Sequence, residues 1–359
     1  MKSVLEYLEN SAKRYPEKTA VRDLQEAYSY RQLEEYGRRI GSALAADLSG
    51  SGCPDRQRMR RPVIVYMEKS ARALASFMGT VYAGCFYTFI SPSQPVSRIR
   101  RILDVLGADR AIFSGGPQDL EKLREAGRVA AQALELAGKS IRPGMTTYQL
   151  DKILHNFIVH CGATPTFLGY GGFPASACIS INEEIIHGIP NRHRVMKAGD
   201  IVSVDVGATL NGFVGDNAAT FPVGEISQAA QDLLETTKAS LYEAIAAAQV
   251  GARLGDVCHA VEAYCSERGY GIVRDYCGHG IGREMHEDPE VPNYGKPGHG
   301  VRLMPGMTFC IEPMINQKGD AVRVLKDGWT VVTANGSLSA HFEHEIAVTK
   351  DGPVILTRP

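Results

Sequence analysis

Residues 199–221 read GDIVSVDVGATLNGFVGDNAATF, and this stretch decides the fold of the second part of the chain. Its first half alternates residues with the period of two that is typical of a β-strand. Asn211-Gly212 is a two-residue turn signal, so the stretch is predicted to form a hairpin. In that register Asp205 faces residue 218 and Asp216 faces residue 207, which makes the two aspartates diagonal neighbours on one face. Two carboxylates placed in this way repel each other unless a cation lies between them.

Three later motifs add residue types that bind metals. His279 lies between glycines in CGHGIG, which leaves space for a ligand to come close. Glu312 interrupts a predicted apolar strand at residues 307–315, where a lone buried carboxylate would be very costly. Glu343 and Glu345 share one face of a strand predicted at residues 339–348, and spacing alone leaves either as the ligand. One imidazole and four carboxylates suit two divalent cations better than a structural zinc.

The segments around the hairpin predict a mixed α+β domain. Apolar residues at helical spacing indicate a helix over residues 119–136 that ends at Gly138. Thr146 and Gln149 form a capping box that opens a helix running to about His160. Two more helices are predicted at residues 227–248 and 256–267, and short strands with Gly/Pro turns account for the rest from Phe167 onward.

The first 113 residues read as a separate α/β domain. Helices are predicted at residues 5–12, 29–48, 70–82 and 96–106, the second of them opened by a Ser29–Gln32 capping box. Strands are predicted at residues 62–67, 85–90 and 110–113, and this βαβαβ order predicts a parallel sheet. A polar loop at residues 49–61 interrupts the domain, and Ser114-Gly-Gly-Pro117 is the predicted junction with the second domain.

Composition excludes several classes of protein. The 359 residues are 44% hydrophobic and 22% charged, with a net charge of -1, so no overall field attracts nucleic acid or an anionic membrane. The eight cysteines form no C-x-x-C pair, which favours reduced buried thiols over a zinc ribbon. We find no apolar signal core at the N-terminus and no stretch long enough to span a membrane, and we therefore expect a cytoplasmic protein.

Residues 117–359 resemble a type I methionine aminopeptidase over essentially the whole length of that enzyme. The resemblance is carried by the runs CISINEEIIHGIP, GDIVSVDVGATLNGFVGDNAATF, YCGHGIGREMHEDP, LMPGMTFCIEPM and SAHFEHEIAVTKDG, in that order. It implies the α+β pita-bread fold and removal of the N-terminal methionine from nascent proteins and peptides. The short spacing between Glu312 and Glu343 leaves no room for the helical insertion that type II enzymes carry there.

The resemblance also implies a dinuclear metal site and selects Glu343 over Glu345. Asp205 would bind one cation, Asp216 and Glu343 would bridge both, and His279 and Glu312 would complete the other. Two divalent ions are implied, and Mn, Fe, Co or Zn would each suit these donors. Our hypothesis for the reaction is that the cations lower the pKa of a water, which then attacks the first peptide carbonyl.

Further roles follow from the same resemblance. Glu312 would carry the proton as general base and acid, and His187 and His286 would hold the peptide and stabilise the tetrahedral intermediate. The methionine pocket would be lined by Tyr170, Phe173, Cys178, Met285 and Trp329. Met285 and Phe167 depart from the side chains that the family often carries, which puts the shape of the pocket, and thus the tolerance for the second substrate residue, in question.

The first 113 residues resemble the N-terminal part of amino-acid-activating, adenylate-forming ligases. The matching runs are AKRYPEKTAV, AYSYRQLEEY and MEKSARALASFMGTVYAGCFYTFISPSQPVSRIRRILDVLGADRAIF. They cover about the first quarter of such an enzyme, and the Ser/Thr/Gly-rich phosphate loop of that family does not follow. We therefore interpret residues 1–113 as a truncated, appended fragment with a packing, docking or solubility role.

Three functions compete on these observations. Methionine aminopeptidase is favoured, with the N-terminal methionine of nascent peptides as substrate, the ribosome as a candidate partner and a monomer as the expected state. A related pita-bread peptidase that cleaves X-Pro peptides is the first alternative. A non-catalytic peptide-binding module is the second, although such modules lose metal ligands and all five are present here.

Overall fold

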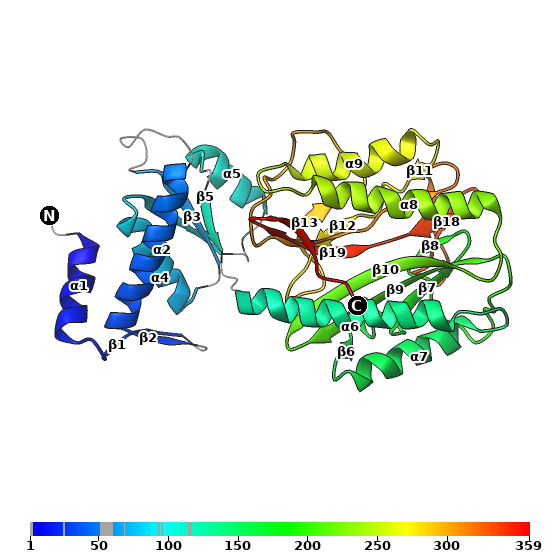
Figure 1. Cartoon of the computed structure of the whole chain (residues 1–359), viewed down its shortest axis with the longest axis horizontal. Coiled ribbons are helices and arrows are strands. Elements are labelled where there is room, and N and C mark those ends of the chain that lie inside the picture. The colour runs from blue at the N-terminus through cyan, green and yellow to red at the C-terminus, as the bar shows by residue number, and fades with distance from the viewer. Residues whose placement is uncertain are drawn as a thin grey trace. The chain divides into compact units, whose positions relative to one another are not determined.

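The computed structural model describes residues 3–23, 26–50, 60–67, 69–91, 94, 96–108, 110–113 and 117–359. Within these ranges the chain forms two compact units, Met1–Gly116 and Pro117–Pro359 (Figure 1). Most of the predicted loop at residues 49–61, including Cys53, and most of the predicted junction lie outside the described residues. The seven described cysteines are all free thiols. No helix of the described chain combines the length and the apolar character that crossing a membrane requires.

The first unit contains the predicted parallel sheet. Its elements are α1 (Val4–Arg14), β1 (Thr19–Arg22), β2 (Ala27–Ser29), α2 (Tyr30–Gly50), β3 (Pro62–Tyr66), α4 (Ala71–Tyr82), β4 (Phe86–Ile90), α5 (Val96–Leu106) and β5 (Arg110–Phe113). Strand β3 lies between β4 and β5 and pairs with both in parallel, as the βαβαβ order predicted. The Ser29–Gln32 capping box is confirmed, because each backbone N–H donates to the other side chain at 2.9 and 3.3 Å.

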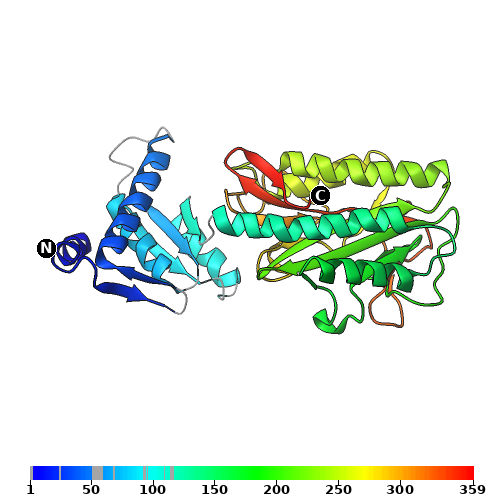
Figure 2. The same cartoon turned by 60° about the horizontal axis from the view of Figure 1, so that its bottom comes forward.

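The second unit has two helix pairs outside a set of strands (Figures 1 and 2). Helices α6 (Pro117–Ser140) and α7 (Thr147–His160) cover one half, and α8 (Gln228–Ala247) and α9 (Leu254–Ser266) cover the other. Each pair has its own apolar core against the strands beside it. The Thr146–Gln149 capping box at the start of α7 is confirmed.

The strands of the second unit form four sheets. Their bounds are β6 (Thr164–Pro165), β7 (Ala177–Ile181), β8 (Glu184–Ile186), β9 (Ile201–Leu210), β10 (Phe213–Pro222), β11 (Gly271–Ile272), β12 (Gly278–Gly280), β13 (Glu287–Val291), β14 (Thr308–Ile311), β15 (Met314–Asn316), β16 (Val322–Val324), β17 (Val331–Thr333), β18 (Ser339–His341), β19 (His344–Thr349) and β20 (Gly352–Ile355). A short 3-10 helix, Tyr170–Gly172, follows β6. Strand β9 pairs with β10, β6 and β7, and the other sheets have the orders β11-β15-β18, β13-β12-β14-β19-β20 and β16-β17-β8.

The hairpin predicted from residues 199–221 is confirmed in its register. Asp205 pairs with Ala218 and Asp216 pairs with Gly207 across β9 and β10. Asn211 and Gly212 have positive φ angles of 53° and 77°, as a two-residue hairpin turn requires. The two aspartates therefore lie diagonally on one face of the β9–β10 ladder.

The predicted end of the first long helix at Gly138 is wrong. Helix α6 continues to Ser140, shortly before Pro143. A Cβ at Gly138 would lie 2.6 Å from Cε1 of Phe221 in β10. Glycine at this position therefore lets the helix pack closely on the strand, and it does not terminate the helix.

The single strands predicted around Glu312 and Glu343 are also wrong, because each is broken at the glutamate. Glu312 lies between β14 and β15, and Glu343 lies between β18 and β19. Pro313 has no N–H to donate to a ladder, and the Glu343 N–H donates to the Ala218 carbonyl of β10 at 2.8 Å. The breaks lie side by side, where the two segments cross between the β11-β15-β18 sheet and the larger sheet.

Replacing Gly215 with alanine is expected to destabilise the second unit. The new Cβ would lie 2.3 Å from the backbone nitrogen of Gly127 in α6, and backbone atoms cannot move aside as a flexible side chain can. We expect a loss of about 1–3 kcal/mol or more in the free energy of unfolding. Urea denaturation of the full chain measures this loss, and an unchanged midpoint would show that α6 does not pack on β10 as described.

Candidate active site

Strands β9 and β10 place two aspartates at the base of a pocket. Asp216 is 2% exposed, and one carboxylate oxygen on each aspartate, Oδ1 of Asp205 and Oδ1 of Asp216, is buried without a protein hydrogen-bond partner. A buried ionised oxygen without a partner is costly. The two carboxylates therefore lie where neither hydrogen-bond donors of the protein nor solvent can fully stabilise their negative charge.

The two paired strand breaks add two glutamates to the same pocket. Glu312 and Glu343 both line it, whereas Glu345 lies outside the lining. A residue between two strands is freed from the strict alternation of a ladder, so its side chain can turn toward the pocket. Glu343 is 2% exposed, and its Oε1 is a third buried carboxylate oxygen without a partner.

His279 enters the pocket from β12 with its ring oriented by the backbone. Its Nδ1 lies 3.0 Å from the Gly280 carbonyl oxygen, so Nδ1 carries the hydrogen and donates it there. Nε2 then faces the acids, 3.6 Å from Oδ2 of Asp216 and 3.7 Å from Oε1 of Glu312. Ligands of one cation at about 2.1 Å lie at comparable separations from each other, so these spacings suit a shared ion.

The pKa shifts of the acids and of His279 also favour a bound cation. Burial raises the pKa of the Asp205 and Glu343 carboxyls well above their ordinary values, and the charge of Asp216 raises them further. Burial by itself would lower the pKa of His279, but the carboxylates of Asp216 and Glu312 outweigh it and raise that pKa to about 9. The protein alone therefore resists the full negative charge of this cluster, which a divalent cation would neutralise.

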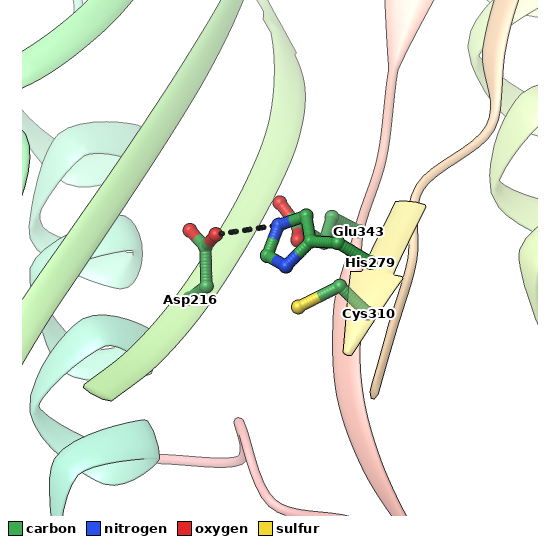
Figure 3. Close-up of side chains that lie close together, drawn as sticks. All are labelled: Asp216, His279, Cys310 and Glu343. Atoms are coloured by element: carbon green, nitrogen blue, oxygen red, sulfur yellow. Dashed lines mark ion pairs between the residues drawn. The ribbon is translucent and has the colours of Figure 1, made fainter. Parts of the chain in front are cut away.

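The tightest group of donors is drawn in Figure 3. Donor atoms of Asp216, His279, Cys310 and Glu343 all lie within 4.8 Å of one another. The donor set and the unpartnered carboxylate oxygens both fit a divalent metal. Asp205 and Glu312 line the same pocket but lie outside this tightest group.

Sequence reasoning missed two residues beside the cluster. Cys310 precedes Glu312 by two positions, and its thiol points into the cluster (Figure 3), but its sequence context reads as an ordinary buried cysteine. His341 is buried with its Nε2 3.7 Å from Oε2 of Glu312. The sequence did contain a signal for His341. It precedes Glu343 by two positions, and residues two apart on a strand point to the same face.

Every residue predicted for the metal, catalytic and substrate sites lines one pocket of about 190 Å³. The lining comprises Phe167, Tyr170, Phe173, Cys178, Ile186, His187, Asp205, Asp216, Tyr276, Cys277, His279, Met285, His286, Glu312, Trp329 and Glu343. Ile186, Tyr276 and Cys277 were not predicted, although each lies within a quoted motif. The volume is below the roughly 300–1,000 Å³ of pockets for drug-sized ligands, and it suits one amino-acid side chain.

The apolar part of the pocket is ordered by ring contacts. The rings of Phe173 and Trp329 meet edge to face with centroids 5.2 Å apart, and His187 lies edge to face with Trp329 at 6.2 Å. The Tyr170 hydroxyl lies 2.7 Å from Nδ1 of His286, and Tyr170 is half exposed at the mouth. The pocket therefore has an aromatic wall, formed by Phe173 and Trp329, next to two histidines that lie beside the acids.

Burial favours the neutral form of both pocket histidines. Burial lowers the pKa of His187 to about 4 and also lowers that of His286. His187 additionally has a positive φ of 58°, which is uncommon for a residue with a side chain and which directs its ring. Neutral imidazoles can each donate one hydrogen bond to a substrate oxygen without a fixed charge.

Metal removal is expected to make stability fall as pH rises from 6.5 to 8. The folded-state pKa of His279 is raised from 6.5 to about 9, so the stability that its proton contributes is lost as pH rises through this interval. The raised pKa values of Asp205 and Glu343 act in the same direction, because the folded chain resists their ionisation. Each extra proton kept by the folded chain changes the free energy of unfolding by about 1.4 kcal/mol per pH unit. His187 has a lowered pKa, so it acts below this window.

Thermal unfolding with and without a chelator measures this effect. Saturating Mn²⁺ or Co²⁺ should remove the decline between pH 6.5 and 8, because the cations hold the carboxylates ionised. A metal-free chain whose melting temperature rises over that interval would contradict the description of the cluster.

An acidic cluster with one oriented imidazole, set between two α+β halves, defines a metal-dependent hydrolase. The model of metallopeptidase family M24 matches residues 121–350, and the chain belongs to this family. A second model, that of AMP-binding enzymes, matches residues 8–155 and so overlaps the first over residues 121–155, which hold most of α6 and most of α7.

Curated relatives named methionine aminopeptidase match about two thirds of the chain. The chain is 52% identical over 239 residues to methionine aminopeptidase from Clostridium acetobutylicum, covering 67% of this chain and 96% of the relative. It is 50% identical over 242 residues to methionine aminopeptidase 1 from Bacillus subtilis, covering 67% of this chain and 97% of the relative.

Solved structures agree with these relatives and confirm the predicted pita-bread fold. Methionine aminopeptidase from Thermotoga maritima superimposes with a TM-score of 0.67 at 45% identity, covering 68% of this chain and 98% of that chain. X-Pro aminopeptidase from the same organism gives a TM-score of 0.55 at 20% identity, covering 76% of this chain and 72% of that chain, which shows the shared fold alone.

Proposed function

We propose that this chain is a methionine aminopeptidase that holds two divalent cations on Asp205, Asp216, His279, Glu312 and Glu343. The observation that carries the proposal is the convergence of four carboxylates and one oriented imidazole in one pocket, with three carboxylate oxygens buried and unpartnered. The relatives at about 50% identity support the choice of methionine. Mn, Fe, Co and Zn all suit this donor set.

The two cations, when bound, supply an acidified water and Lewis-acid polarisation of the scissile carbonyl. The protein contributes the remaining steps. Glu312 accepts the proton of the attacking water and returns it to the leaving amine. His187 and His286 donate hydrogen bonds to the substrate oxygen on which negative charge develops, and they do so as neutral rings.

The 190 Å³ pocket accounts for specificity at the first residue. An unbranched thioether fills a narrow apolar space and makes favourable contacts with aromatic rings such as those of Phe173 and Trp329. A methionine side chain in this space would bring the first peptide bond toward the acids. Met285 and Phe167 also line the pocket, so they bear on the shape that the substrate meets.

Peptide turnover tests the function. The metal-free full chain is incubated with Met-Ala-Ser and with an X-Pro peptide, with Mn²⁺, Fe²⁺, Co²⁺ or Zn²⁺ added in turn. Release of free methionine from the first peptide is expected with at least one metal. Cleavage of the X-Pro peptide alone would assign a different peptidase, and absence of turnover with all four metals would contradict the proposal.

The first unit is proposed to be an adenylate-forming-ligase fragment appended to the peptidase. The AMP-binding match and the parallel β4-β3-β5 sheet support this origin. The phosphate loop of that family does not follow residue 113 in the sequence, and we assign the fragment a packing, docking or solubility role. The ribosome is a candidate partner of the protein. A cytoplasmic monomer completes the proposal.

Deletion of residues 1–116 is expected to leave the peptidase intact. All lining residues of the pocket belong to the second unit, and a compact unit with its own core can fold alone. The chain that begins at Pro117 should keep kcat/KM for Met-Ala-Ser within about two-fold of the full chain. A loss of activity in a shortened chain that is still folded would place part of the reaction in the first unit.

A further inference from the structure

His341 is a buried imidazole that the proposed reaction has not yet used. It is 1% exposed at the end of β18, and neither of its ring nitrogens has a hydrogen-bond partner among the described residues. Its Nε2 lies 3.7 Å from Oε2 of Glu312. It does not line the pocket, so it does not touch the substrate.

The backbone of His341 is held firmly by the hairpin that carries Asp216. The hydroxyl of Thr220 in β10 accepts from the His341 N–H and donates to the His341 carbonyl, each at 2.9 Å. Ser203 of β9 holds that hydroxyl in turn at 2.8 Å. The β15–β18 ladder pairs Met314 with His341, which sets the ring beside Glu312.

Glu312 consequently lies between two imidazoles. His279 approaches its Oε1 and His341 approaches its Oε2, at 3.7 Å in each case. The side-chain amide of Asn293 donates to the main-chain carbonyl of Glu312 at 2.9 Å. Asn293 thus fixes the backbone of Glu312, while the orientation of the carboxylate is left to the two rings.

We propose that His341 is a positioning residue for Glu312: its Nε2–H donates to Oε2 and keeps Oε1 directed at the metal cluster. The inference rests on the proposed function, in which Glu312 is both a ligand and the proton carrier. A separation of 3.7 Å is longer than a hydrogen bond, and such contacts commonly shorten when an active site is loaded. Partners behind a metal ligand fix the orientation of that ligand in this way.

The test compares two substitutions at this position. His341→Leu removes the donor, and His341→Gln keeps an N–H donor in a side chain of similar reach. Each full-length variant is titrated with Mn²⁺ by calorimetry, and kcat and KM are measured with Met-Ala-Ser. His341→Leu should lose about 10- to 100-fold in metal affinity or kcat. KM should stay within about three-fold, because His341 does not meet the peptide.

His344 provides a matched control. It is half-buried as the first residue of β19, but its Nδ1 bonds to the Thr357 hydroxyl at 2.9 Å and faces no pocket acid among its described contacts. His344→Leu should therefore alter thermal stability without the loss in kcat. His341→Gln should recover to within about five-fold of the unmodified chain.

Two results would overturn the inference. A folded His341→Leu variant with unchanged Mn²⁺ affinity and kcat would do so, and so would a His341→Gln variant as impaired as His341→Leu. If His341→Leu does not fold, His341→Asn replaces it, because its shorter amide cannot reach Oε2. An unmodified chain that neither binds Mn²⁺ nor releases methionine would instead remove the proposed function itself.

Discussion

Asp216→Asn is expected to abolish methionine release, with a fall in kcat of well over about 100-fold. Loss of a residue that only supports a metal ligand already costs up to about 100-fold, and Asp216 is itself a proposed ligand. Asp216 would be one of the five residues that hold the cations, and asparagine keeps its size while removing its charge. The variant should also bind fewer than two Mn²⁺ ions per chain. Peptide turnover and calorimetric titration measure the two effects independently.

Without metal, the Asp216→Asn variant should not lose stability. The charge of Asp216 raises the pKa values of Asp205, Glu343 and Glu345, so removing it relieves repulsion in the metal-free chain. Metal-free Asp216→Asn should be at least as stable at pH 8 as the metal-free unmodified chain. It should gain far less stability from Mn²⁺, because little metal binds.

Asp151 is the control for this comparison. It is also 2% exposed, but its Oδ1 accepts from the backbone N–H groups of Ser176 and Ala177 at 2.8 and 3.2 Å. Asp151→Asn should destabilise the chain and leave metal stoichiometry unchanged. If Asp216→Asn behaves like Asp151→Asn, Asp216 has a structural role only.

Glu312→Gln is expected to lower kcat by about 10²- to 10⁴-fold, the usual worth of a general base. Glutamine retains the shape and one acceptor oxygen but cannot accept the proton of the attacking water. KM should change little, since the aromatic wall and the histidines bind the peptide. Steady-state kinetics with Met-Ala-Ser under saturating metal separate the two constants.

Glu345 is the matched control for Glu312. It is 0% exposed, and burial followed by the charge of Asp216 raises its pKa well above the ordinary value. Its neutral form is therefore favoured, and Glu345→Gln replaces it with a neutral group of the same shape outside the pocket lining. A Glu312→Gln variant that keeps more than about a tenth of kcat would contradict the assignment of the proton carrier.

Local signals predicted the hairpin and the helix starts well. Asn211-Gly212 fixed the register of β9 and β10, because a two-residue turn leaves one alignment. The capping boxes at Ser29 and Thr146 marked the starts of α2 and α7, because both partners lie within one turn of helix. In each case the physical cause is contained in a few consecutive residues.

Features that depend on distant partners were predicted poorly. Gly138 was predicted to end a helix, but its lack of a side chain instead lets Phe221 of β10 pack closely against the helix. Glu312 and Glu343 looked like residues within strands, but both strands break where they change sheets, beside each other and beside Ala218. His341 and Cys310 gained meaning only when the ladders placed them against the acids. Sequence patterns record periodicity, and they do not record which strands meet.

A crystal structure of the full chain grown with Mn²⁺ or Co²⁺ tests the central claim most directly. Anomalous scattering would locate the cations without reference to any assumed ligand. We expect two ions about 3.5–4 Å apart, within coordinating distance of Asp205, Asp216, His279, Glu312 and Glu343. Ions bound elsewhere, or a pocket in which one or more of these five side chains points away from the metal, would contradict the account.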